Sequence, residues 1–118
     1  MDNKIVFQNF DFADSEYKSY NMSENSVLTI NMYTWQEVPF KIVFKDTIYF
    51  SYELGDGIEN VYEVPDNAQF FYGALLRNYT EKPPLDHPYK GFEIRDLYDF
   101  AFIKIVAESA LITIETES

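Results

Sequence analysis

His87 has the clearest capacity for chemistry, because it is the only histidine in the 118-residue chain. It stands between Asp86 and Pro88, and an aspartate beside a histidine can orient the imidazole as a general base. The chain has no cysteine, and no serine lies in the Gly-x-Ser-x-Gly context of an activated nucleophile. We therefore interpret His87 as an exposed residue of a proline-rich loop.

Other catalytic and metal-binding patterns are equally weak. One histidine without cysteine cannot form a closed zinc site, and Asp56 and Glu59 flank Gly57 without the spacing of a calcium loop. Two carboxylates at catalytic separation, as in glycoside hydrolases, stay open as an alternative because that arrangement is spatial. The sequence otherwise predicts a protein that is not an enzyme and holds no cofactor and no metal.

The distribution of charge is more informative than any motif. The chain carries 20 acidic and 9 basic residues, a net charge of −11, and no basic residue lies between Lys45 and Arg77. Such a surface disfavours nucleic acid and anionic membranes and favours a basic protein partner. Carboxylates would steer the encounter, and interleaved tyrosines would supply buried anchors. We predict that the partner-binding residues are Asp46, Glu53, Asp56, Glu59, Tyr62, Glu63 and Asp66.

The same acids also fit a simpler interpretation, in which they cover a solvated sheet face. Asp66 would then be the N-cap of a helix, with Gln69 as its partner in the first turn. Glu59 and Glu63 are expected on one side of a strand, because alternate residues of a strand share a side. Trp35, at the end of another strand, is expected to fill the core.

A sheet must position these residues, since apolar and polar residues alternate most regularly from Val27 to Tyr52. We interpret that stretch as an antiparallel meander, and the last two strands as a hairpin around Glu108 and Ser109. The loop over residues 80–91 contains three prolines. Strands are predicted over residues 14–22, 27–35, 40–46, 47–54, 58–64, 92–97, 99–107 and 110–115. Residues 5–12 are expected to form a short strand or an extended arm that packs on the core, and one helix is expected near residues 67–79, with a strand as the alternative there.

Length and composition complete this prediction. A chain of 118 residues that is 47% hydrophobic fits a single domain over residues 1–118. We expect an α+β, mostly β fold with a twisted antiparallel sheet of six to eight strands, sandwich-like or half-barrel. No apolar run approaches the roughly 18 residues that span a bilayer, and the polar N-terminus does not resemble a signal peptide. A cytoplasmic protein is therefore expected.

The segment Leu28–Trp35, followed by residues 40–46, resembles the paired strands of small acidic bacterial immunity proteins. These proteins accompany polymorphic toxins, including those of contact-dependent growth inhibition. The resemblance implies a cytoplasmic protein that binds one cognate toxin domain, often a nuclease with a basic active site, and blocks it. No binding residue is carried over by motif.

Two further alternatives follow from the residues themselves. The many aromatic side chains could line the apolar pocket of a small-ligand-binding β domain. Exposed aromatics and a sheet edge could instead pair the chain with a second copy of itself in an assembly.

Overall fold

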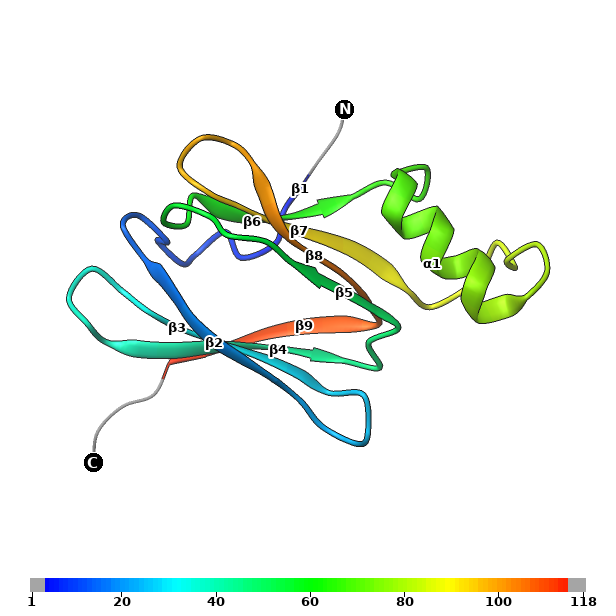
Figure 1. Cartoon of the computed structure of the whole chain (residues 1–118), viewed down its shortest axis with the longest axis horizontal. Coiled ribbons are helices and arrows are strands. Elements are labelled where there is room, and N and C mark those ends of the chain that lie inside the picture. Colours follow the sequence, from blue (N-terminus) through cyan, green and yellow to red (C-terminus); the bar gives the residue numbers. More distant parts are fainter. Residues whose placement is uncertain (1–3, 115–118) are drawn as a thin grey trace.

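Two antiparallel sheets face one another, with a single helix at one end, in the computed structural model, which describes residues 4–114 (Figure 1). The five-stranded sheet has the order β1 (Lys4–Ile5), β6 (Asn60–Val64), β7 (Lys90–Arg95), β8 (Ala101–Ala107) and β5 (Tyr49–Tyr52). The four-stranded sheet has the order β2 (Glu16–Met22), β3 (Leu28–Tyr33), β4 (Pro39–Lys45) and β9 (Ser109–Ile114). The predicted mostly β, sandwich-like α+β class is confirmed, with the strands divided between two sheets.

The core lies between the two sheets and follows from the alternation in the sequence. In β3 and β4, Ile30 lies opposite Ile42 and Met32 lies opposite Phe40, and all four side chains are buried. Their polar neighbours in sequence point away from the core, because successive side chains of a strand leave opposite faces. Fully buried residues of β7 and β8 close the core from the other sheet, namely Ile94, Ile103 and Ile105.

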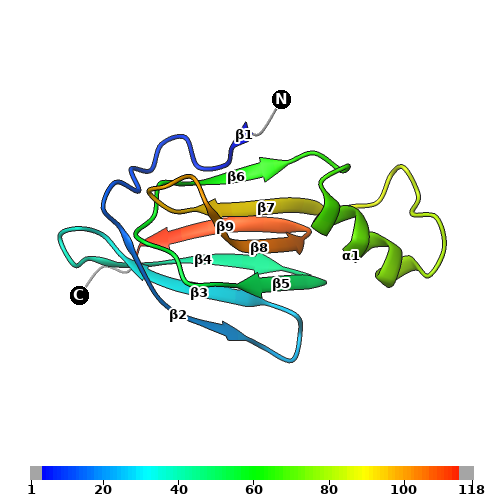
Figure 2. The ribbon, with the colours of Figure 1, turned by 45° about the horizontal axis from the view of Figure 1, so that its top comes forward.

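Helix α1 (Gln69–Tyr79) covers one end of the outer face of the five-stranded sheet (Figure 2). Phe71 and Leu75 are buried there against Val64 and Val106. Gly91 permits this close approach, since a Cβ at that position would lie 2.6 Å from Cδ2 of Phe71. The predicted helix is therefore confirmed, and its position leaves the opposite end of the sheet uncovered by helix.

The start of the helix differs from the prediction. Its N-cap residue is Ala68, and no side chain among the residues described makes a cap hydrogen bond there. The predicted N-cap role of Asp66 is wrong, because its carboxylate turns to His87. At the other end Thr80 adopts a left-handed conformation, and its N–H donates to the carbonyl of Leu76 at 3.0 Å.

Strand pairing also differs from the prediction. β5 pairs with β8 in the five-stranded sheet and does not continue the β2–β3–β4 meander. β8 and β9 lie in different sheets, so the predicted hairpin around Glu108 is wrong. The alternation of apolar and polar residues shows which face of a strand is buried. Both sheets of a sandwich have such an apolar face, so the alternation does not show to which of the two sheets a strand belongs.

Aromatic side chains cover the core along the side of the sandwich where the edge strands of the two sheets are not hydrogen-bonded to each other. At the side formed by β2 and β5, the ring centroids of Tyr20 and Phe50 lie 4.7 Å apart. Of the short strand or extended arm predicted over residues 5–12, only β1 is a strand, and the irregular segment after it packs on the core through Phe12, whose ring centroid lies 4.6 Å from that of Phe10. No helix within residues 4–114 has the length and apolar character needed to cross a membrane.

Candidate functional site: an acidic and apolar loop face

Two loops meet at the end of the five-stranded sheet that lies opposite to α1 (Figure 1). Residues 53–59 connect β5, at one edge of the sheet, to β6, near the other edge, so they pass the turn between β7 and β8. The N–H of Glu53 donates to the carbonyl of Phe102 and that of Glu59 to Arg95, each at 2.8 Å. We call residues 53–59 and 96–100 together the loop face.

The carboxylate of Asp96 joins the two loops. It is buried, and its Oδ1 accepts the N–H groups of Tyr98 at 2.9 Å and Phe100 at 3.0 Å. Its Oδ2 accepts the N–H of Asp56 at 3.2 Å. Burial alone would raise the pKa of Asp96, but the hydrogen bonds from Phe100, Tyr98 and Asp56 outweigh it and lower that pKa. Asp96 is therefore a charged structural brace, whereas a catalytic acid needs a raised pKa.

Two glycines give the first loop its shape. Gly57 has a φ of +76°, in the left-handed region that favours glycine, and a Cβ there would lie 2.9 Å from Cδ1 of Leu97. A Cβ on Gly55 would overlap the ring of Phe102. The loop can therefore lie close against the turn between β7 and β8, and its conformation is set by contacts on both sides.

The loop face exposes large apolar side chains. Leu54 is 85% exposed and Tyr98 78% exposed, and Leu97 and Phe100 are also exposed. Exposed apolar groups that gather on one rigid surface are typical of binding sites, whereas scattered ones are ordinary. The exposed carboxylates Glu53, Asp56, Glu59 and Asp99 belong to the same two loops.

A shared cation lies at the margin of this surface. The guanidinium of Arg95 lies 4.7 Å from the centre of the Tyr62 ring and bonds to Glu93 at 2.8 Å and Asp99 at 3.3 Å. The Tyr62 hydroxyl lies 2.7 Å and 2.9 Å from the two carboxylate oxygens of Glu59. Arg95 thus pairs with two carboxylates, Glu93 and Asp99, and Glu59 is held by a neutral hydroxyl, so the local charge stays negative.

Burial is the largest cause of a raised pKa at Tyr62, followed by the hydrogen bond and the negative charge of Glu59. Together they bring that pKa to about 12. The hydroxyl therefore stays neutral and acts as a donor that holds Glu59 in place.

The structure brings four of the seven predicted partner-binding residues to one end. Glu53, Asp56 and Glu59 belong to the loop face, and Tyr62 holds Glu59. Asp46 precedes β5 and so lies at the opposite end of that strand, and Asp66 lies beside α1. Glu63 lies on the same side of β6 as Val61 and is paired with Phe92 of β7. Glu59 bonds instead to Tyr62, whose side chain leaves the other side of β6. The prediction that Glu59 and Glu63 share one side is therefore wrong.

Sequence reasoning missed the apolar part of this surface. The exposure of Leu54, Leu97, Tyr98 and Phe100 was not predicted, because the sequence alone does not distinguish an exposed apolar residue from a buried one. The role of Asp96 was partly visible in the sequence, since the carboxylate of an aspartate in a turn commonly accepts a hydrogen bond from the backbone N–H two residues later. The predicted burial of Trp35 is wrong as well, because it is 67% exposed in the turn between β3 and β4.

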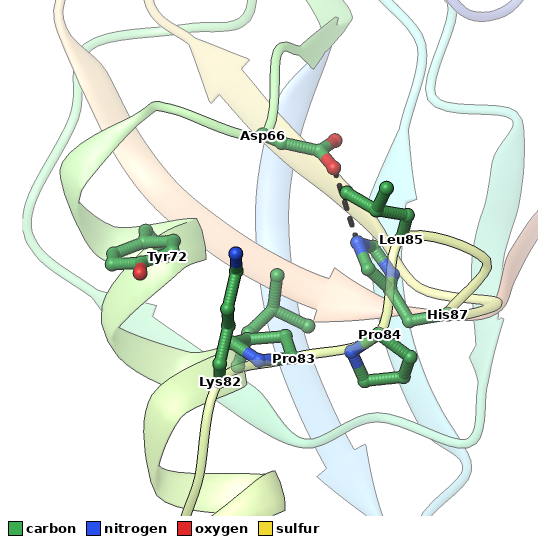
Figure 3. Close-up of a pocket in the computed structure, with 8 residues that line it drawn as sticks. Asp66, Tyr72, Lys82, Pro83, Pro84, Leu85 and His87 are labelled. Atoms are coloured by element: carbon green, nitrogen blue, oxygen red, sulfur yellow. Dashed lines mark hydrogen bonds and ion pairs between the residues drawn. The ribbon is translucent and has the colours of Figure 1, made fainter.

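His87 occupies a separate site beside α1 (Figure 3). Its side chain is 6% exposed and its Nε2 lies 3.1 Å from Oδ2 of Asp66, whose side chain is 71% exposed. The N–H of Tyr89 donates to Nδ1 at 3.2 Å, and the tautomer that fits both contacts carries its proton on Nε2, toward Asp66. The predicted exposed histidine is wrong, and its partner is Asp66 in place of Asp86.

This arrangement fits a structural role for His87. The imidazole meets the ring of Phe71 edge-on, with centroids 5.8 Å apart. Both nitrogens are engaged, one as donor and one as acceptor, so neither is free to take a proton from a substrate. The neighbouring hollow, lined by Leu75, Pro84 and Leu85 among others, has a volume of about 180 Å³. Sites for drug-sized ligands have roughly 300–1,000 Å³.

Within residues 4–114, no group of three or more histidine, aspartate or glutamate side chains is arranged to hold a metal ion. No protein-family model, curated protein or solved structure matches the chain. The functional inference therefore depends on the geometry of the loop face.

Proposed function

We propose that this protein is a cytoplasmic inhibitor that binds a basic protein domain and blocks its working surface, as an immunity protein does for its cognate toxin. One observation carries the proposal. The loop face combines exposed apolar side chains with carboxylates, and the buried carboxylate of Asp96 holds both loops in one shape.

The two kinds of side chain have different tasks in binding. Exposed carboxylates accelerate the encounter with a positively charged partner, by an effect that salt weakens. Leu54 and Tyr98 supply apolar area that contact with a partner would remove from water, which is where most binding energy arises. Because the loops are fixed beforehand, little conformational entropy is lost on binding.

Charge defines the partner class. The sequence has no basic residue within residues 53–59 or 96–100, so the loop face matches a surface rich in lysine and arginine. A nuclease domain has such a surface where it holds phosphates. In this proposal the carboxylates occupy the positions of phosphates, and nucleic acid is excluded by competition.

The test uses the basic C-terminal domain of a toxin encoded beside the gene of this protein. The two proteins are produced together, and the experiment measures complex formation, nuclease activity and growth of cells that express the toxin domain. The expected result is a stoichiometric complex, loss of nuclease activity and restored growth. A toxin domain that stays free and active in the presence of this protein contradicts the proposed function.

Charge reversal then locates the interface. Replacing Glu53 and Asp56 by lysine should slow association about tenfold or more at low salt, with a smaller effect at high salt. The matched control replaces Glu24 and Glu81, which are also exposed but lie far from the loop face, and carries the same change in charge. Equal losses in both variants would show that diffuse charge, and not the loop face, binds the partner.

A further inference from the structure

A small polar pocket opens beside the loop face, where the edge strands of the two sheets approach each other. It has a volume of about 160 Å³ and is lined by Glu16 and Tyr17 from β2, Tyr52 from β5, and residues 55–57 of the loop face. We propose that this pocket binds the guanidinium group of one arginine side chain of the partner. This inference rests on the proposed function and specifies one contact of the same surface.

Stacked tyrosine rings form one wall of the pocket. Tyr17 lies opposite Met32 and Tyr52 opposite Ile103, so both side chains point toward the space between the sheets. Their ring centroids are 4.6 Å apart and their planes differ by 27°. The face of an aromatic ring carries the negative part of its quadrupole and attracts a planar cation.

Carboxylates complete the pocket. Glu16 and Asp56 come from different segments, and every charged residue that lines the pocket is acidic. An isolated bridge between Ser15 and Ile58 ties the start of β2 to the loop, so the backbone segments that carry the two acids are held together before any ligand arrives. A phosphate or carboxylate ligand would be repelled there.

Arginine fits this combination better than other cations do. A guanidinium is planar, stacks on aromatic rings and bonds to a carboxylate through two parallel N–H groups, whereas a lysine ammonium is compact and strongly hydrated. The pocket is well below the roughly 300 Å³ of the smallest usual small-molecule sites, and its volume suits a single side-chain head group.

The test is a titration followed by nuclear magnetic resonance. The probe is the peptide acetyl-Gly-Arg-Gly-amide, with the lysine and the neutral citrulline peptides as controls. The arginine peptide should shift the ring signals of Tyr17 and Tyr52 and the amide signals of Gly55 and Gly57, with saturation on the order of millimolar concentration. The lysine peptide should bind several times more weakly, and the citrulline peptide should cause no saturable shift.

Variants assign the effect to the pocket. The double substitution Glu16→Gln and Asp56→Asn keeps the size of both exposed side chains and should lower affinity about tenfold. The matched control, Glu24→Gln with Glu81→Gln, should leave affinity unchanged. Equal shifts with all three peptides, or an unchanged affinity in the pocket variant, would overturn the proposal.

The peptide titration needs no natural partner, so it separates this inference from the proposed function. Specific arginine binding without any complex with the toxin domain supports the pocket and rejects inhibition. A complex with the toxin domain, combined with no arginine preference, supports inhibition and rejects the pocket.

Discussion

The N–H of Asp56 donates to the Oδ2 atom of Asp96 at 3.2 Å and joins two loops that are 40 residues apart in the sequence. The same carboxylate accepts two N–H groups of its own turn. A single buried side chain therefore sets the relative position of the exposed groups on the loop face.

Replacing Asp96 by alanine should loosen the loop face. The amides of Asp56, Tyr98 and Phe100 lose their acceptor, so their hydrogen exchange should accelerate on the order of tenfold. Replacing Asp56 by alanine is the matched control, since it removes an exposed carboxylate but leaves the N–H that Asp96 binds. Unchanged exchange at all three amides in the Asp96 variant would contradict the bracing role.

Tyr62 should ionise late. Its pKa of about 12 exceeds the ordinary value of about 10. Because the folded state holds the hydroxyl proton more tightly, the stabilisation is fully present below about pH 10 and is lost as the pH rises through about 12. Ultraviolet titration should show one tyrosine ionising near pH 12, absent in Tyr62→Phe, and Glu59→Gln should move its pKa toward the ordinary value. Ionisation of all tyrosines near pH 10 would refute this.

Two glycines should respond oppositely to alanine. At Gly91 a Cβ would lie 2.6 Å from the ring of Phe71, so Gly91→Ala should destabilise the protein by about 1–3 kcal/mol. At Gly73, within α1, the nearest neighbour of a Cβ would be the Arg77 side chain at 4.0 Å. Gly73→Ala should therefore stabilise the protein by up to about 1 kcal/mol. Urea unfolding measures both, and the same sign for both variants would contradict the packing of α1.

The buried imidazole should matter more than its exposed partner. His87→Ala removes a buried ring and should lower the free energy of unfolding by about 2–3 kcal/mol. Asp66→Ala should lower it by no more than about 1 kcal/mol, since that carboxylate is largely solvated. Nitrogen NMR of the imidazole should show the proton on Nε2. A larger effect of Asp66 than of His87 would argue against a packing role.

Much of the fold was predictable because local alternation and turn residues specify strands. β3, β6 and α1 lie within the predicted ranges, and β4 begins one residue before its predicted range. Strand partners were not predictable, because β4 binds β9 and β5 binds β8 across long stretches of chain. Such pairing depends on how the apolar faces of the two sheets stack, and the two-residue alternation of apolar and polar residues does not encode that arrangement.

The site was predictable in its charge and not in its shape. The base-free interval indicated Glu53, Asp56 and Glu59, which belong to one loop. It also included Asp46 and Glu63, because the sequence does not show at which end of a sheet, or on which side of a strand, a residue will lie. The buried state of His87 depends on Phe71 and Asp66, which lie far from it in sequence.

The partners of β4 and β5 have a consequence for how the protein is made. β8 completes the pairing of β5, β9 completes that of β4, and the turn that braces the loop face lies between β7 and β8. All of these segments leave the ribosome after the strands with which they pair, so a nascent chain that ends before β7 contains no finished sheet. The loop face can therefore take its shape only after β8 has been synthesised, because its second loop and the partner of β5 both belong to that later part of the chain.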